Sequence, residues 1–107
     1  MAKFRFIEWL LVWIQETTHY EFEWDGGNQT KSLTKHLVTT EEVEEVFRIG
    51  PAAPLGIQTS PEVIEQRLGI VGTTASGRVL HVVFTLRTDK VRPISARPAH
   101  KKRKGLV

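Results

Sequence analysis

The sequence predicts an α+β fold, in which a small antiparallel β-sheet has amino-terminal helices packed on one face. Residues 77–97 contain two alternating apolar runs on either side of a short polar break, which is typical of a β-hairpin. The earlier part of the chain carries helix signals at 3–16 and 39–49. The length of 107 residues suits one domain with one modest core.

The amino-terminal segment 3–16 has no Gly or Pro, and its apolar side chains surround nearly the whole circumference. This pattern predicts a helix, with a strand as the alternative. Trp9 and Trp13 need to be covered by the core or by a partner, and a homodimer through residues 6–14 is one such partner. The apolar run is shorter than the ~20 residues of a membrane span. No signal-peptide cleavage site follows it.

Residues 20–24, YEFEW, alternate aromatic and acidic side chains, which predicts an early strand with the aromatic rings inward. The DGGN sequence that follows predicts a turn. Asn28 is the expected N-cap of a short helix that ends at His36. The i, i+4 spacing places Lys31 and Lys35 on one face of that helix.

The helix predicted at 39–49 has the clearest boundaries. Thr39 as N-cap and Glu42 three residues later form a capping box, and Gly50-Pro51 ends the helix. The Pro- and Gly-rich segment after it is expected to be a loop with a short strand near 55–58.

The next strand is expected at 65–73. If Gly72 pairs with Arg78, the alternation places Arg67 on the same face as His81.

The hairpin is expected to have a three-residue loop, Thr88 to Lys90, because this register keeps the apolar face continuous. Phe84 then lies opposite Ile94, and His81 lies opposite Arg97. One face of the sheet is apolar. The other face is cationic, with His81, Arg87, Ser95 and Arg97, and it also carries Val83, Thr85, Val91 and Pro93.

The charges are strongly segregated along the chain. Residues 1–66 carry a net charge of −6 and residues 67–107 carry +9, which gives the overall +3. This asymmetry favours a polyanionic partner. The tail from His100 onward is either part of that surface or merely solvated, and it is either a helical stub or disordered. The absence of Cys excludes disulfides and thiol chemistry and indicates a reducing compartment.

The sequence has no metal-ligand cluster, phosphate-binding glycine loop or nucleophile elbow, so no metal or other cofactor is predicted. It does contain the residue types of a metal-free ribonuclease, which needs a base for the 2′-OH proton, an acid for the 5′ oxygen and cations around the phosphorane. The catalytic candidates are Lys35, His36, Arg67, Arg87 and Arg97. The RNA-binding candidates are His81, Arg92, Ser95, Lys101 and Lys102.

Each candidate also has a structural interpretation. Arg67 and Arg87 would pair with helical glutamates, His81 would be an ordinary strand histidine, and the Lys35-His36 pair would cap a helix.

An ordered series of short motifs resembles the BrnT toxin family. The series runs through FEWD at 22–25, KH at 35–36, EEV at 41–43, GRVL at 77–80 and ISAR at 94–97, and it spans residues 22 to 99. Lys35, His36, Arg67, Arg87 and Arg97 match charged positions of the family, and further matches are Trp24, Asp25 and Ser95.

The resemblance implies a type II toxin with a RelE-like ribonuclease fold that cleaves RNA without a metal in the cytoplasm. It implies a cognate ribbon-helix-helix antitoxin, DNA contact only through the antitoxin complex, and a homodimer or a heterotetramer with the antitoxin. The corresponding organisation is an amino-terminal helical extension at 1–19, a BrnT-like toxin domain at 20–99 and a basic tail at 100–107.

The chain departs from the family at several positions. Asn28 stands where Lys is frequent, Ser32 where Asn is frequent and Leu37 where Gly is frequent, and the tail lacks acidic and aromatic residues. Pro93 replaces Ile, which removes a donor from the strand pairing and predicts an edge strand or a bulge. These departures motivate an alternative function, a catalytically weak module that binds RNA or antitoxin and acts in operon regulation.

Overall fold

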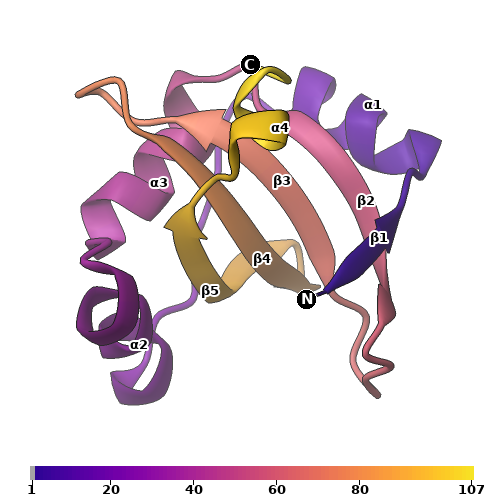
Figure 1. Ribbon diagram of the computed structural model, residues 1–107. Helices are drawn as coiled ribbons and strands as arrows, with labels where there is room; N and C mark the ends of the chain where they lie inside the picture. Colours follow the sequence, from indigo (N-terminus) through magenta and orange to yellow (C-terminus); the bar gives the residue numbers. More distant parts are fainter. Residues whose placement is uncertain (1) are drawn as a thin grey trace.

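A computed structural model describes residues 2–107, apart from the side chain of Leu33. It confirms the predicted fold class, because one antiparallel five-stranded sheet has helices packed against it (Figure 1). The strands, in their order across the sheet, are β1 (Lys3–Arg5), β2 (Ala53–Ser60), β3 (Leu68–Thr73), β4 (Val79–Arg87) and β5 (Lys90–Pro98). The helices are α1 (Glu8–Glu16), α2 (Gly26–His36), α3 (Thr40–Ile49) and α4 (Lys101–Lys104).

The helices are divided between the two faces and one edge of the sheet. In Figure 1, α1 and α3 lie behind the sheet, the short α4 lies in front of it, and α2 lies beside β5. The hydrophobic core fills the layer between the sheet and the two helices behind it. Its largest fully buried side chains include Phe84, Leu10, Leu68, Ile70 and Leu80.

Both structures considered for the amino-terminal segment occur, because a short strand precedes a helix that begins at Glu8. Leu10 is fully buried, and the ring of Trp13 stacks on that of Phe84 with 5.9 Å between their centroids. Trp9 remains 40% exposed. The core therefore covers one tryptophan and leaves the other at the surface.

Residues 20–24 do not form the predicted strand, although their aromatic rings do pack against the core. Phe22 makes a single parallel bridge to Val91. Two hydrogen bonds of 2.8 Å join Val91 to the backbone at 21 and 23. The ladder stops there because the next outward position on β5 is Pro93, which has no N–H to donate.

The predicted N-cap of α2 is wrong, since the helix begins at Gly26, before Asn28. Oδ1 of Asp25 instead accepts hydrogen bonds from the N–H groups of Gly27 (2.8 Å) and Asn28 (3.0 Å). The freed Asn28 side chain donates through Nδ2 to the carbonyl oxygen of Pro93 at 3.1 Å.

The boundaries of α3 agree with the prediction. Thr39 and Glu42 form the reciprocal capping box, and Gly50 follows the last turn with φ of 31°. The apolar stripe also faces the core as expected, with Val43, Val46 and Phe47 buried.

β2 is longer than expected, and β3 begins later than predicted, at Leu68. Gly72 pairs with Leu80 rather than Arg78, a shift of two residues. The longer loop is closed by hydrogen bonds around Thr74. Because the side-chain period of a strand is two, the shift leaves Arg67 on the same face as His81.

The hairpin joins β4 to β5 as predicted, but its turn is shorter. Its loop consists of Thr88 and Asp89, whose φ values are 50° and 65°, so Arg87 pairs with Lys90 rather than Val91. These left-handed conformations are those of a two-residue hairpin turn.

A β-bulge at Ile94 corrects the predicted register further. His81 still lies opposite Arg97, but Phe84 lies opposite Pro93 instead of Ile94. The extra residue places the missing N–H of Pro93 on the outer side of the strand, where β4 does not need it. The bulge therefore exchanges the faces predicted for the residues before it. Val91 and Pro93 face the core, and Arg92 faces the opposite side.

Candidate functional site

A groove lies between α2 and the second half of β5. It has a volume of about 340 Å³ and is lined by Lys31, Ser32, Lys35, His36, Ser95 and Arg97. We call it the α2–β5 groove. It brings together three of the five catalytic candidates, Lys35, His36 and Arg97, and one RNA-binding candidate, Ser95.

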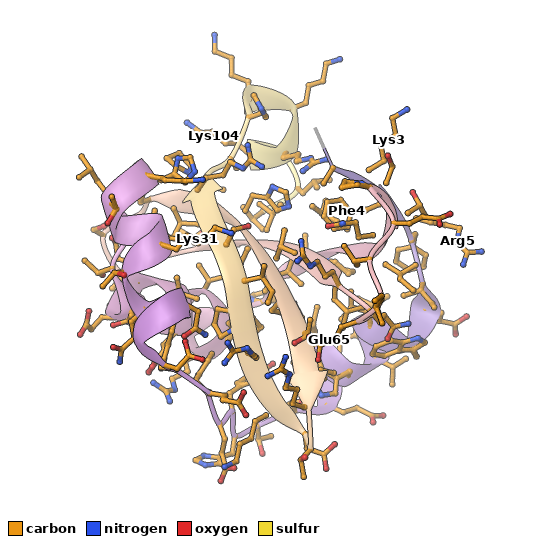
Figure 2. All side chains as sticks on the ribbon, turned by 90° about the horizontal axis from the view of Figure 1, so that it is seen from below. Lys3, Phe4, Arg5, Lys31, Glu65 and Lys104 are labelled. Carbon is orange, nitrogen blue, oxygen red and sulfur yellow. The ribbon has the colours of Figure 1, made fainter. Side chains whose placement is uncertain are left out.

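Two local patterns place these side chains in the groove. Lys31 and Lys35 are one helical turn apart in α2, so they share a face. Ser95 and Arg97 follow the bulge in β5 and alternate onto the same side of the sheet. Figure 2 shows Lys31 beside the second half of β5, on the side of the sheet that carries α4.

The α2–β5 groove has a positive electrostatic character. Among residues 2–107, no ion pair holds Lys31, Lys35 or Arg97. No described residue in the lining carries a carboxylate. The groove therefore offers unneutralised cations and hydroxyl groups to a ligand, which suits a phosphate.

His81 lies next to this groove on β4 but contributes no charge to it. The side chain is 6% exposed, and Nδ1 accepts a hydrogen bond from Nη1 of Arg103 at 3.1 Å. Burial, and then the nearby charges of Arg103, Arg97 and His100, lower the pKa of His81 to about 4. Its ring also meets that of Phe4 edge to face. At neutral pH it is a buried, uncharged acceptor.

Arg87 lies at the other end of the same sheet face. It is six residues from His81 along β4, which at about 3.3 Å per residue is roughly 20 Å. Nε of Arg87 binds Glu65 at 2.8 Å, and Nη1 binds Glu23 at 3.3 Å. The hydrogen bond to Glu65 is the main reason that the pKa of Arg87 is raised. Figure 2 shows Glu65 nearer the β4–β5 turn than Lys31 is.

Arg92 belongs to this second cluster, because the bulge turned it toward Glu23 and Asp25. Its Nη1 lies 3.1 Å from Glu23 and its Nη2 lies 2.7 Å from Asp25. The Arg92 hydrogen bond lowers the pKa of Asp25. Arg67, which directly precedes β3, is half-buried and lies near Glu65, whose pKa its charge helps to lower after the larger effect of Arg87.

The two clusters divide the predicted site residues. Lys35, His36, Ser95 and Arg97 lie together, with His81 beside them, whereas Arg67, Arg87 and Arg92 lie toward the hairpin turn among acidic side chains. The carboxylates that hold Arg87 come from segments outside the helices, not from helical glutamates.

The basic tail forms α4, so of the two alternatives for this segment the helical stub is the one present. Lys101 and Lys102 are exposed on it. Arg103 turns inward instead, toward His81 and over the ring of Phe4 at 5.7 Å.

Sequence reasoning did not place Lys31 or Ser32 among the site residues. The i, i+4 spacing of Lys31 and Lys35 would have indicated that Lys31 shares the site with Lys35. Ser32 could be identified only from the folded chain, in which α2 lies beside β5.

A larger hollow, of about 540 Å³, lies where α1 and α3 end. Among the described lining residues, Arg48 is the only Lys, Arg, Asp or Glu. Arg48 is already bound to Glu44 at 2.6 Å and lies over the ring of Phe22. We place the candidate site in the α2–β5 groove because its cations are not engaged in this way.

Residues 2–107 contain neither a candidate metal-binding cluster nor a membrane-spanning helix. No group of three or more His, Cys, Asp or Glu side chains in that range is arranged to hold a metal ion. No helix there has the length and apolar character needed to cross a membrane.

The comparison with protein families agrees with the motif series. A family described as the ribonuclease toxin BrnT of a type II toxin-antitoxin system matches residues 24–103. A comparison with curated proteins finds no match for the chain. The match covers most of the chain, including α2, all of β4 and β5, and every residue that lines the α2–β5 groove. The chain therefore belongs to the BrnT family of ribonuclease toxins of type II toxin-antitoxin systems.

Proposed function

We propose that this toxin cleaves RNA in the α2–β5 groove and that it does so without a metal ion. One observation carries the proposal. Three side chains with unneutralised positive charge or proton-transfer chemistry, Lys35, His36 and Arg97, line one groove that has no carboxylate among its described lining residues. Magnesium sites use carboxylate oxygens, so this lining suits a mechanism based on cations and proton transfer.

The proposed reaction is an attack by the RNA's own 2′ oxygen on the adjacent phosphorus. His36 takes the 2′-OH proton, because a neutral imidazole nitrogen can accept one. Lys35 gives a proton to the departing 5′ oxygen, since an ammonium is a donor only. The 2′-O–P bond forms and the P–O5′ bond breaks, which leaves a 2′,3′-cyclic phosphate and a 5′-hydroxyl.

Arg97 holds the scissile phosphate in this proposal. Its guanidinium can bind two phosphate oxygens at once and stabilise the charge of the phosphorane. Ser95 donates a hydrogen bond to the same group, and Lys31 contacts a neighbouring phosphate.

Arg67, Arg87 and Arg92 contact a more distant part of the RNA in this scheme, and their distance from Arg97 separates them from the chemical step. Lys101 and Lys102, which are exposed on α4, make further contacts with the RNA backbone. Glu65 must release Arg87 before that contact forms, because the pair is closed at 2.8 Å.

The test is cleavage of an end-labelled RNA by purified toxin in the presence of EDTA. We expect activity to persist with the chelator and to fall by about 100-fold or more in both His36→Ala and Arg97→Ala. Arg87→Ala should lower activity only a few-fold. His19→Ala is the matched control, since His19 is an exposed histidine beside the other hollow. Full activity in both His36→Ala and Arg97→Ala, or loss of activity with EDTA, contradicts the proposal.

We further propose that a cognate ribbon-helix-helix antitoxin neutralises the toxin in the cytoplasm by covering the α2–β5 groove, in a heterotetramer that alone binds operator DNA. The type II family supports an antitoxin partner, and the open cationic groove is the surface whose closure would stop the reaction. Mixing the toxin with the product of the adjacent reading frame should abolish cleavage and produce a complex of defined mass by light scattering. Unchanged cleavage by the complex would refute this.

One observation favours the alternative of a catalytically weak binding module. Leu37, directly after His36, has φ of 55°, a left-handed conformation that is unfavourable for a side chain with a Cβ. If this strain misplaces His36, the protein binds RNA but does not cleave it at any pH from 5 to 9.

A further inference from the structure

The helix that carries half of the α2–β5 groove is held to the sheet by a buried hydroxyl. Oγ of Ser32 accepts a hydrogen bond from the backbone N–H of Ala96 at 2.8 Å. Ser32 is 8% exposed, so the bond is shielded from water. β5 is the edge of the sheet, and the N–H of Ala96 points away from β4 and toward α2.

The place of this bond in the two segments is significant. Ser32 lies between Lys31 and Lys35 in the helix, and Ala96 lies between Ser95 and Arg97 in the strand. The bond therefore joins the two walls of the groove at their middle.

A second contact holds the carboxyl end of the same helix. Nη2 of Arg78 donates to the carbonyl oxygen of His36 at 3.1 Å, and Nη1 donates to that of Leu37 at 2.8 Å. These carbonyls have no partner within the helix, and a cation there is also favoured by the helix dipole.

Arg78 is itself held in place by Glu42, whose carboxylate lies 3.2 Å from Nη1. Partial burial alone would raise the pKa of Glu42, but the hydrogen bonds from the Thr39 backbone and from Arg78 outweigh it and lower the pKa. Glu42 therefore stays ionised at neutral pH and ties the end of α2 to the start of α3.

We propose that Ser32 and Arg78 are positioning residues for RNA cleavage, which set Lys35 and His36 at their working distance from Arg97. Neither residue touches the RNA in this assignment. The assignment rests on the proposed function, because it concerns the geometry of that same groove. A displacement of about 1 Å between catalytic groups is enough to slow a reaction by about 100-fold.

The experiment measures single-turnover cleavage at saturating RNA and, separately, the dissociation constant for an RNA that has a 2′-deoxy nucleotide at the cleavage position. The variants are Ser32→Ala, which removes the acceptor, and Arg78→Lys, which keeps the charge but loses the fork that reaches both carbonyls. The rate constant should fall at least tenfold in each variant, while the dissociation constant changes less than threefold. Ser32→Thr, which keeps the hydroxyl, should retain a rate within threefold of the wild type.

Two matched controls accompany these variants. Thr34→Ala removes an exposed hydroxyl from the same helix, and Arg48→Lys alters an arginine that also pairs with a glutamate. Both should cleave at the wild-type rate. If Ser32→Ala does not fold by circular dichroism, Arg78→Lys carries the test, because Arg78 is 32% exposed and its loss leaves the core intact.

The outcomes separate the two proposals. Wild-type rates in folded Ser32→Ala and Arg78→Lys overturn the positioning assignment, and so does a loss of binding as large as the loss of rate. If the wild-type protein does not cleave, or if His36→Ala and Arg97→Ala cleave normally, the proposed function fails instead.

Discussion

At the scale of the residue, His81 illustrates how burial changes the chemistry of a side chain. The alternation of β4 placed it on a cationic face, and its face is as predicted. The predicted positive charge of His81 is absent at neutral pH, because Phe4 and Arg103 shield the ring from water and its pKa is lowered to about 4. The sequence could not reveal this, since Phe4 lies 77 residues earlier in the chain.

This burial predicts a pH dependence of stability. The unfolded chain takes up a proton at His81 as the pH falls through its ordinary pKa of 6.5, whereas the folded chain does not until about pH 4. The contribution of His81 is thus complete above pH 6.5 and is lost as the pH falls toward 4. We expect the free energy of unfolding to decrease by about 2 kcal/mol between pH 7 and pH 5 from this group alone.

Urea titrations of the wild type and of His81→Gln at both pH values check this dependence. Between pH 7 and pH 5, His81→Gln should lose about 2 kcal/mol less free energy of unfolding than the wild type. His19→Gln should lose as much as the wild type does. Equal losses in all three proteins would show that His81 is not held neutral by the fold.

At the scale of the element, local patterns were sufficient where the interaction is local. The capping box of α3 joins residues three positions apart, and the alternation of β4 follows its own pleat. Pro93 predicted an edge strand or a bulge, and β5 has both features. The register that results from the bulge was not predicted, because it depends on where the missing N–H of Pro93 can be accommodated. The pairing of β1 with β2 escaped prediction altogether, since it joins segments more than fifty residues apart. It relies on Gly56, where a Cβ would overlap the carbonyl of Arg5.

The candidate site residues also divide into those that local patterns could predict and those that depend on the folded chain. Lys35 and His36 were found because they are adjacent, and Arg97 because the register at His81 was correct. Arg87 shared the predicted face but lies in an ion pair. Its partners Glu23 and Glu65 could be identified only from the folded chain.

The junction of α2 and α3 gives a prediction at this scale. Leu37 is 74% exposed and has φ of 55°, so its side chain gains little from packing while its backbone is strained. Leu37→Gly should raise the free energy of unfolding by up to ~1 kcal/mol. The midpoint of thermal unfolding measures this. Leu106→Gly, in the exposed tail, serves as the control. A destabilised Leu37→Gly would show that the strain is not released.

At the scale of the whole molecule, the charge segregation along the chain does not survive folding. Lys31 and Lys35 belong to the acidic half of the sequence, yet they share the α2–β5 groove with Arg97 from the basic half. Conversely, Glu23 from the acidic half neutralises Arg87 and Arg92. One part of the basic surface, made of Lys31, Lys35 and Arg97 from both halves of the chain, is therefore concentrated at one edge of the sheet.

This concentration predicts the salt dependence of RNA binding. Each phosphate contact contributes about −0.7 to the slope of log K against log salt concentration for a single strand. Lys31→Ala should reduce the magnitude of the slope by about 0.7. Lys3→Ala should leave it unchanged, because β1 lies at the opposite edge of the sheet. Fluorescence anisotropy over a range of salt concentrations measures both, and equal slopes in Lys31→Ala and the wild type would remove Lys31 from the RNA contact.

The hydrogen bonds along the outer side of β5 affect solubility as well. Val91 is hydrogen-bonded to the segment before α2. Pro93 is hydrogen-bonded to Asn28, and Ala96 is hydrogen-bonded to Ser32. A nine-residue edge strand without these partners would be a template for pairing with another chain, whereas β1, at the other edge, has only three residues. The helix that bears Lys35 and His36 thus also protects the sheet from aggregation, so substitutions that detach it should reduce the yield of dispersed protein.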